Sequence, residues 1–205
     1  TPQQRVAMLK QWLQASQAQL RTYEWVETTV ITKGGEEKSR KQNTVYYGAD
    51  GKLQKVPVAG GSEGKSGGPP GRLLKKAAEN KKEEMVDYME QAAALMHSYV
   101  PPDPNRIQQA VNNGKLSVTP GQRVRLDFRD YLKSGDLLSV EIEAPTNRLI
   151  GMAVTSYLDT PKDEVRMKIG MGVLPDGTIF TSRTTLDAVA KGVALTIENT
   201  GHRRK

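Results

Sequence analysis

The sequence predicts an α+β fold in which a curved antiparallel β-sheet has helices over one face. Two observations favour this fold. Runs of alternating apolar and polar residues, separated by turn residues, recur in both halves of the chain, whereas segments 2–20 and 72–113 have helical spacing. The 205 residues are enough for one sizeable core, so we expect a single domain over 1–205.

The first helix is predicted at residues 2–20. Thr1 and Pro2 are typical of a helix start, and Val6, Leu9 and Leu20 fall near one face. The next residues are rich in β-branched and aromatic side chains, which favours strands. We expect strands at 22–33, 37–47 and 52–58, with glycine-rich turns between them.

Residues 59–71 contain six glycines and two prolines, so they predict a flexible loop. A long helix is expected at about 72–99, and Pro101, Pro102 and Pro104 end it. A short helix is expected at 105–113.

The last ninety residues predict further strands. The alternation is clearest where Val124, Leu126 and Phe128 alternate with charged residues. Similar patterns are found at 138–142, at Ile150, Met152 and Val154, and at 165–173, 179–185 and 193–199. Because the apolar residues stay on one side, we expect one covered face and one solvated face.

The net charge of +7 is concentrated in the basic segment 52–82, which holds eight basic and two acidic residues. This segment has no aromatic residue to stack on bases, so nucleic acid is not expected as a partner. A solvated surface is the first interpretation, and contact with anionic lipid head groups is the second. The sequence has no apolar run long enough to span a membrane, and it leaves the oligomeric state open.

One motif resembles a phosphate-binding loop: Ala59, four residues, then Gly64, Lys65 and Ser66. The motif requires a helix directly behind the lysine, and Gly67 to Gly71 with two prolines cannot begin one. We therefore expect a flexible loop rather than a nucleotide site.

Catalytic and metal-binding residue types are sparse. The chain has no cysteine, and His97 and His202 are its only histidines, so no metal site and no cofactor are expected. Glu141 and Glu143 share the polar side of a predicted strand, where a solvated face is the default interpretation. We predict no catalytic residues and a protein that is not an enzyme.

The methionines Met85, Met89 and Met96 fall on one face of the long predicted helix. Flexible, polarisable methionines suit a surface that repacks around varied apolar ligands. They suit equally a helix that simply covers the sheet, and the sequence leaves both interpretations open.

The order of elements resembles the LolA/LolB-like superfamily of periplasmic lipoprotein carriers. The stretch TYEWVETTVITKGGEEKSRKQNTVYYGADGKLQKVPV resembles its opening hairpins, and Arg123 to Asn199 resembles its later strands. The resemblance implies an incomplete barrel whose concave apolar face is partly closed by helices and accepts acyl chains. It also implies a periplasmic or otherwise extracytoplasmic location.

We therefore predict a binding or carrier protein for an apolar or amphipathic ligand, such as a lipid or the acyl chains of a lipoprotein. The alternative is a non-catalytic structural or protein-interaction module of the cell envelope with a filled core. Strand parity leaves open whether Trp25 or Val26 faces the ligand. The predicted ligand-binding residues are Trp25, Met85, Met89, Met96, Leu126, Phe128, Val140, Ile142, Met167 and Ile169.

Overall fold

The computed structural model describes residues 15–16, 18–58, 72–100 and 102–205, and for 72–83 and 104 it describes the backbone alone. In chain order the elements are β1 (Tyr23–Lys33), β2 (Glu36–Tyr47), β3 (Leu53–Pro57), α2 (Arg72–His97), α3 (Pro104–Asn112), β4 (Leu116–Thr119), β5 (Arg123–Arg129), β6 (Leu137–Glu143), β7 (Arg148–Tyr157), β8 (Glu164–Val173), β9 (Ile179–Ala188), the 3-10 turn η1 (Val189–Lys191) and β10 (Val193–Arg204).

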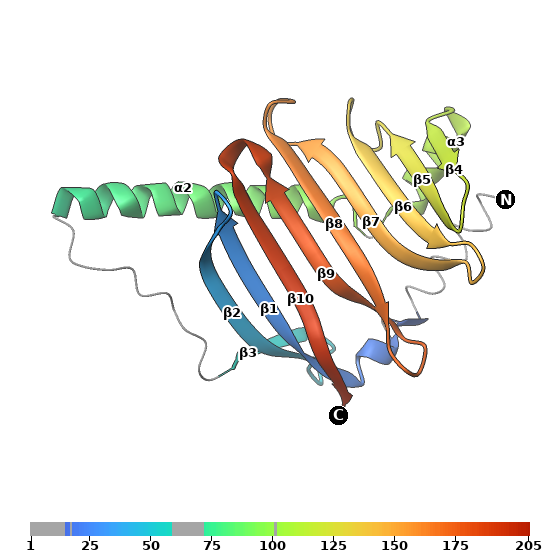
Figure 1. Cartoon of the computed structure of the whole chain (residues 1–205), viewed down its shortest axis with the longest axis horizontal. Helices are drawn as coiled ribbons and strands as arrows, with labels where there is room; N and C mark the ends of the chain where they lie inside the picture. The colour runs from blue at the N-terminus through green and yellow to red at the C-terminus, as the bar shows by residue number, and fades with distance from the viewer. Residues whose placement is uncertain (1–14, 17, 59–71, 101) are drawn as a thin grey trace.

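The strands form one open antiparallel sheet in the order β3-β2-β1-β10-β9-β8-β7-β6-β5-β4 (Figure 1). The N-terminal meander β1–β3 and the C-terminal meander β4–β10 are joined by pairing of β1 with β10. The last strand therefore lies in the interior of the sheet. The predicted α+β fold, with a curved antiparallel sheet that is not closed into a barrel, is confirmed.

One face of the sheet is covered and holds the core. The C-terminal half of α2 and the helix α3 pack on this face, through Ala92, Met96, Tyr99 and Ile107. The strand residues of the same cluster are Val124, Leu126, Phe128, Leu138, Val140, Ile142, Leu149, Met152, Val154, Val165, Met167, Ile169 and Leu186.

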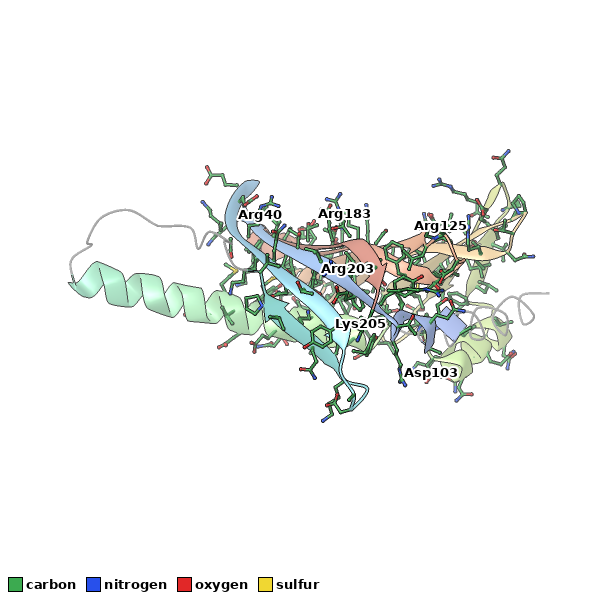
Figure 2. All side chains as sticks on the ribbon, turned by 90° about the horizontal axis from the view of Figure 1, so that it is seen from below. Arg40, Asp103, Arg125, Arg183, Arg203 and Lys205 are labelled. Atoms are coloured by element: carbon green, nitrogen blue, oxygen red, sulfur yellow. The ribbon has the colours of Figure 1, made fainter. Side chains whose placement is uncertain are left out.

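The other face of the sheet is solvated, as the alternation predicts. Figure 2 shows Arg40, Arg125 and Arg183 projecting from the side of the sheet away from α2, and all three residues are exposed. Burial of apolar side chains on the covered face alone accounts for the period of two in the strands.

The helix ends follow from local chemistry. The α2 helix ends at His97, just before the cluster of prolines. Asp103 caps α3, because its side chain accepts a 2.8 Å hydrogen bond from the N–H of Asn105 and Pro104 occupies the first helical position. In the predicted N-terminal helix, residues 15–16 and 18–20 are helical. The rest of 2–20, and the predicted loop 59–71, lie outside the described residues.

Two predictions about strands were wrong. A β-bulge in the β6–β7 pairing, between Glu141 and Ile142, shifts the alternation of β7. As a result Leu149 is buried with 1% exposure, while Ile150 lines a hollow on the solvated face. The edge strand β4 was not predicted at all, because its four residues are exposed or only partly buried and carry no strong alternation.

Candidate functional site

The covered face holds a cavity of about 270 Å³. It lies where Ser16, Leu20 and Val100 approach β1, β8, β9 and β10. Its lining residues are Ser16, Leu20, Trp25, Tyr47, Leu53, Val100, Met152, Ile169, Met171, Ile179, Phe180, Thr181, Asn199 and His202. Most of this wall is apolar, so the cavity favours an apolar ligand or part of one.

Aromatic rings form one side of the cavity. The Trp25 ring stacks on the imidazole of His202, with centroids 5.5 Å apart and planes inclined by 15°. The Phe180 ring packs against the imidazole of His202, with centroids 4.1 Å apart. Tyr47 lies 6.2 Å from Trp25. A bulge in the β1–β10 register, where Gly201 adopts a φ of 63°, places His202 opposite Trp25.

The polar groups of this wall are arranged by hydrogen bonds. The indole N–H of Trp25 donates to the side-chain oxygen of Asn199 at 3.0 Å, and the amide of Asn199 donates to the Thr181 carbonyl at 2.9 Å. Burial lowers the pKa of His202, so its imidazole is neutral at pH 7. The site therefore presents an uncharged imidazole beside a mainly apolar wall.

The structure brings only two of the predicted ligand-binding residues to this cavity. Trp25, rather than Val26, faces it, together with Ile169. Met85 is partly buried on α2, and Met89 is partly buried against the core. The other six residues belong to the closed core cluster: Met96, Leu126, Phe128, Val140, Ile142 and Met167.

Several lining residues escaped the sequence prediction. Asn199 and His202 are polar, so a search for apolar alternation passes over them. Phe180 sits beside a bulge between β8 and β9, where the alternation breaks. The one available signal was composition, since Phe180 and His202 belong to residue types that occur only twice each in the chain.

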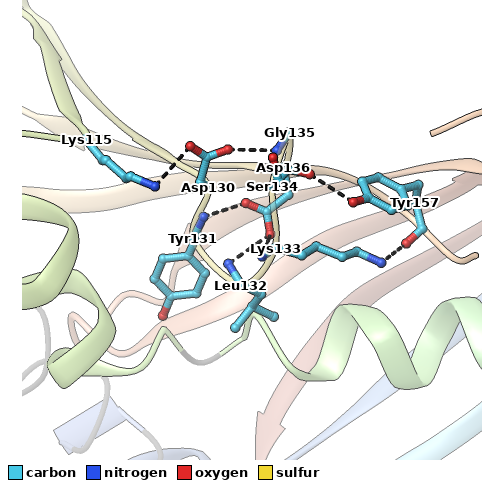
Figure 3. Close-up of polar contacts among 9 residues, drawn as sticks. All are labelled: Lys115, Asp130, Tyr131, Leu132, Lys133, Ser134, Gly135, Asp136 and Tyr157. Atoms are coloured by element: carbon cyan, nitrogen blue, oxygen red, sulfur yellow. Dashed lines mark hydrogen bonds and ion pairs between the residues drawn. The ribbon is translucent and has the colours of Figure 1, made fainter. Parts of the chain in front are cut away.

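A second polar cluster is structural rather than chemical (Figure 3). The carboxylate of Asp136, which is 2% exposed, accepts hydrogen bonds from the backbone N–H groups of Tyr131, Leu132 and Lys133. It also accepts one from the Tyr99 hydroxyl. Burial, and secondarily this bond to Asp136, raise the pKa of Tyr99. The cluster fixes the β5–β6 loop to the end of α2, and its hydrogen-bonding groups are already used.

The remaining candidates for chemistry are separate from one another. The Thr146 hydroxyl, followed by Arg148, lowers the pKa of Glu143, which is the opposite of what a general acid needs. His97 is exposed at the end of α2. Within the described ranges, no three His, Asp or Glu side chains are grouped to hold a metal ion. The motif around Lys65 lies outside those ranges.

The predicted head-group contact of segment 52–82 stays a prediction. Of its lysines, Lys55 is bonded to both carboxylate oxygens of the buried Glu27, at 2.7 and 2.9 Å. Residues 72–82 hold five basic and one acidic residue on the part of α2 that projects past the edge of the sheet (Figure 1). Among the helices in the described parts of the chain, none is long and apolar enough to cross a membrane.

Comparison with known proteins gives little to add. No protein-family model and no curated protein matches the sequence. Among solved structures, the chain is similar to a DUF1329 family protein from Desulfovibrio piger ATCC 29098, with a TM-score of 0.36 and 11% sequence identity over 96% of this chain and 93% of that chain. A TM-score this low does not establish a common fold.

Proposed function

We propose that this protein is an extracytoplasmic, non-catalytic binding or carrier protein for an apolar or amphipathic ligand. The observation that carries the proposal is the cavity of about 270 Å³ between the covered face of the sheet and the side chains of Ser16 and Leu20. Trp25, Ile169 and Met171 give it an apolar wall. Each methylene group of a ligand buried against such a wall contributes about 0.8 kcal/mol.

The size of the cavity limits the ligand. Sites for drug-sized molecules enclose about 300–1,000 Å³, so this cavity suits one acyl chain or a group of similar volume. Its polar groups suit an uncharged or weakly acidic end, because Asn199 is already bonded on both sides and His202 is neutral. The ligand class we propose is a single-chain fatty acid or the acyl chain of a larger lipid.

The test uses Trp25 as a reporter. The chain has two tryptophans, so a Trp12→Phe background leaves Trp25 as the single one. Titration with ω-bromododecanoic acid should quench Trp25 fluorescence saturably, because the bromine of a bound chain lies in the same cavity. Bromoacetate, which lacks the chain, serves as the quenching control.

The matched variants differ by two positions on β8. Met171 lines the cavity, whereas Val173 is exposed and outside it. A carboxylate in an apolar site is costly, so Met171→Asp should weaken binding at least about tenfold and Val173→Asp should leave it unchanged. Equal quenching by bromoacetate and the long-chain acid would refute the proposal.

A second candidate is a structural or protein-interaction module of the cell envelope. It is favoured by the closed core, which contains seven of the ten residues predicted to contact ligand, Ile169 included. The same titration separates the two candidates, since a structural module predicts no saturable quenching of Trp25.

A further inference from the structure

The strands β9 and β10 separate at one end of the sheet. Their backbone pairing runs from Ala188–Val193 to Arg183–Glu198 and stops there. Beyond that point β9 still pairs with β8 as far as Ile179, and β10 still pairs with β1 as far as Arg204. Figure 1 shows the two strands diverging toward the C-terminus. The freed segments are 179–182 and 199–204, and we call the space between them the split.

The split forms part of the cavity wall. Of its lining residues, Ile179, Phe180 and Thr181 come from the freed part of β9, and Asn199 and His202 come from the freed part of β10. In the described wall of the cavity, the split is thus the section where side-chain contacts, and not backbone hydrogen bonds, connect two neighbouring strands.

Side chains satisfy the backbone groups that the split leaves without strand partners. The Thr181 carbonyl accepts from Asn199 at 2.9 Å. The N–H of Ile179 donates to the Ser16 hydroxyl at 3.2 Å, and the neighbouring Thr178 hydroxyl bonds to Gln19 at 2.6 Å. Buried backbone groups must be paired, so these contacts make the separation a stable feature of the fold.

A charged contact joins the two sides of the split at the end where the strands are farthest from their shared pairing. Asp176 lies in the tight β8–β9 turn, where the N–H of Gly177 donates to the Leu174 carbonyl. Its carboxylate accepts from the Tyr23 hydroxyl at 2.6 Å and from the Arg204 guanidinium at 2.8 Å. Tyr23 begins β1 and Arg204 ends β10, so Asp176 joins the tip of one hairpin to the opposite side of the split. We call this contact the latch.

We propose that the split is the portal of the cavity and that the Asp176 latch controls the rate at which ligand enters and leaves. This rests on the proposed function, because a portal requires a ligand. Opening moves the β8–β9 hairpin tip, residues 173–179, away from the ends of β1 and β10. Elsewhere in the described wall, β7–β8 are held by continuous backbone pairing, and β1–β10 are paired on both sides of the bulge at Trp25. Segments held only by side-chain contacts open more readily than paired strands.

The experiment locks and releases the latch. The chain has no cysteine, so Asp176→Cys with Arg204→Cys introduces the only two thiols. A short bis-methanethiosulfonate crosslinker then spans the split and is removed by reduction. The control is Glu24→Cys with Arg203→Cys. These two residues pair directly across β1 and β10, on one side of the split, and also form an ion pair.

The measured quantity is the rate of Trp25 quenching by ω-bromododecanoic acid in stopped flow, in the Trp12→Phe background. The crosslink at 176 and 204 should slow association and release at least about tenfold, and reduction should restore both rates. The crosslink at 24 and 203 should change neither rate. Asp176→Asn, which weakens the latch without a crosslink, should speed association and release together and leave the equilibrium constant nearly unchanged.

The outcomes separate this inference from the proposed function. Saturable quenching with the same rates in the locked and reduced forms would overturn the portal and leave the binding function intact. Absence of saturable quenching in every variant, the unmodified protein included, would overturn both. Thermal unfolding of each variant confirms that altered rates arise from a folded protein.

Discussion

The two halves of the covered face differ in what fills them. Over β4–β8 the face is a closed core, in which Phe128 and Leu138 are 1% and 0% exposed. Over β1, β9, β10 and the end of β8 that carries Met171, the face keeps a cavity, and Phe180 and Met171 in its wall remain partly exposed. The same alternating pattern produced both halves. Alternation therefore predicts which face of a strand is covered, but it does not predict whether side chains or a cavity lie over that face.

The difference follows from where the helices lie. The first half is filled by Met96 of α2, by Tyr99 just after that helix and by Ile107 of α3. In the second half, Ser16, Leu20 and Val100 are the only described residues outside the strands that line the cavity. Interiors are packed to high density wherever side chains can reach, so a cavity in one half indicates that no large side chain of the described residues reaches it.

The chain's two phenylalanines give the largest expected contrast. Phe128→Ala should destabilise the protein by about 3–5 kcal/mol, because it empties a closed core. Phe180→Ala should cost only about 1–2 kcal/mol, since its ring already borders open space and loses mainly its packing on His202 and Gly172. Urea unfolding followed by circular dichroism measures both. Equal losses would show that the cavity half is packed as tightly as the core half.

A smaller effect is expected at the boundary of the halves, where Ile169 belongs to both the core and the cavity wall. A Cβ on Gly151 would come within 2.9 Å of the Ile169 carbonyl oxygen, so Gly151→Ala must push that backbone aside and should cost about 1–3 kcal/mol.

Gly170 is the matched control for this boundary, because it pairs with Gly151 across β7 and β8. A Cβ there would lie 3.5 Å from the Ser182 hydroxyl, an ordinary contact, so Gly170→Ala should be close to neutral. Urea unfolding measures stability, and Trp25 emission reports whether the cavity is disturbed. If Gly151→Ala left the free energy of unfolding unchanged, the backbone at Ile169 would have to shift at little cost.

Much of the fold could be predicted from the sequence, because Val124, Leu126 and Phe128 alternate without interruption and the helices have strong end signals. The misses have local causes. One extra residue in the β6–β7 bulge places Leu149 on the covered face, where Ile150 was predicted. The site was predicted far less well than the fold.

The reason for the poor site prediction is that contacts distant in sequence define the site. The bond from Tyr23 to Asp176 joins residues 153 positions apart, and Trp25 meets Asn199 across 174 positions. The spacing of apolar residues within one strand or helix carries no information about such distant pairs. The methionines of α2 correctly predicted a helix that covers the sheet. Met96, however, is part of the closed core and does not line the cavity.

The smallest expected effect is the pH dependence of the latch, which tests whether the cavity half opens before the core half. The Tyr23 hydroxyl, followed by Arg204, holds the pKa of Asp176 well below its ordinary value. A carboxyl whose pKa is lowered on folding contributes stability above its unfolded pKa of about 3.9. That contribution is lost as the pH falls toward the folded pKa.

The melting temperatures of the wild type and Asp176→Asn should therefore differ by a constant amount between about pH 7 and pH 5 and converge below about pH 4. Tyr23 is buried while the Arg204 side chain is 66% exposed, so Tyr23→Phe should remove more of this pH dependence than Arg204→Gln. The acid-induced change should appear in Trp25 emission before it appears in far-ultraviolet circular dichroism. A difference in melting temperature that persists unchanged at low pH would mean that Asp176 acts through its shape rather than its charge. Simultaneous loss of both signals would mean that the two halves unfold as one unit, with no separate opening of the cavity half.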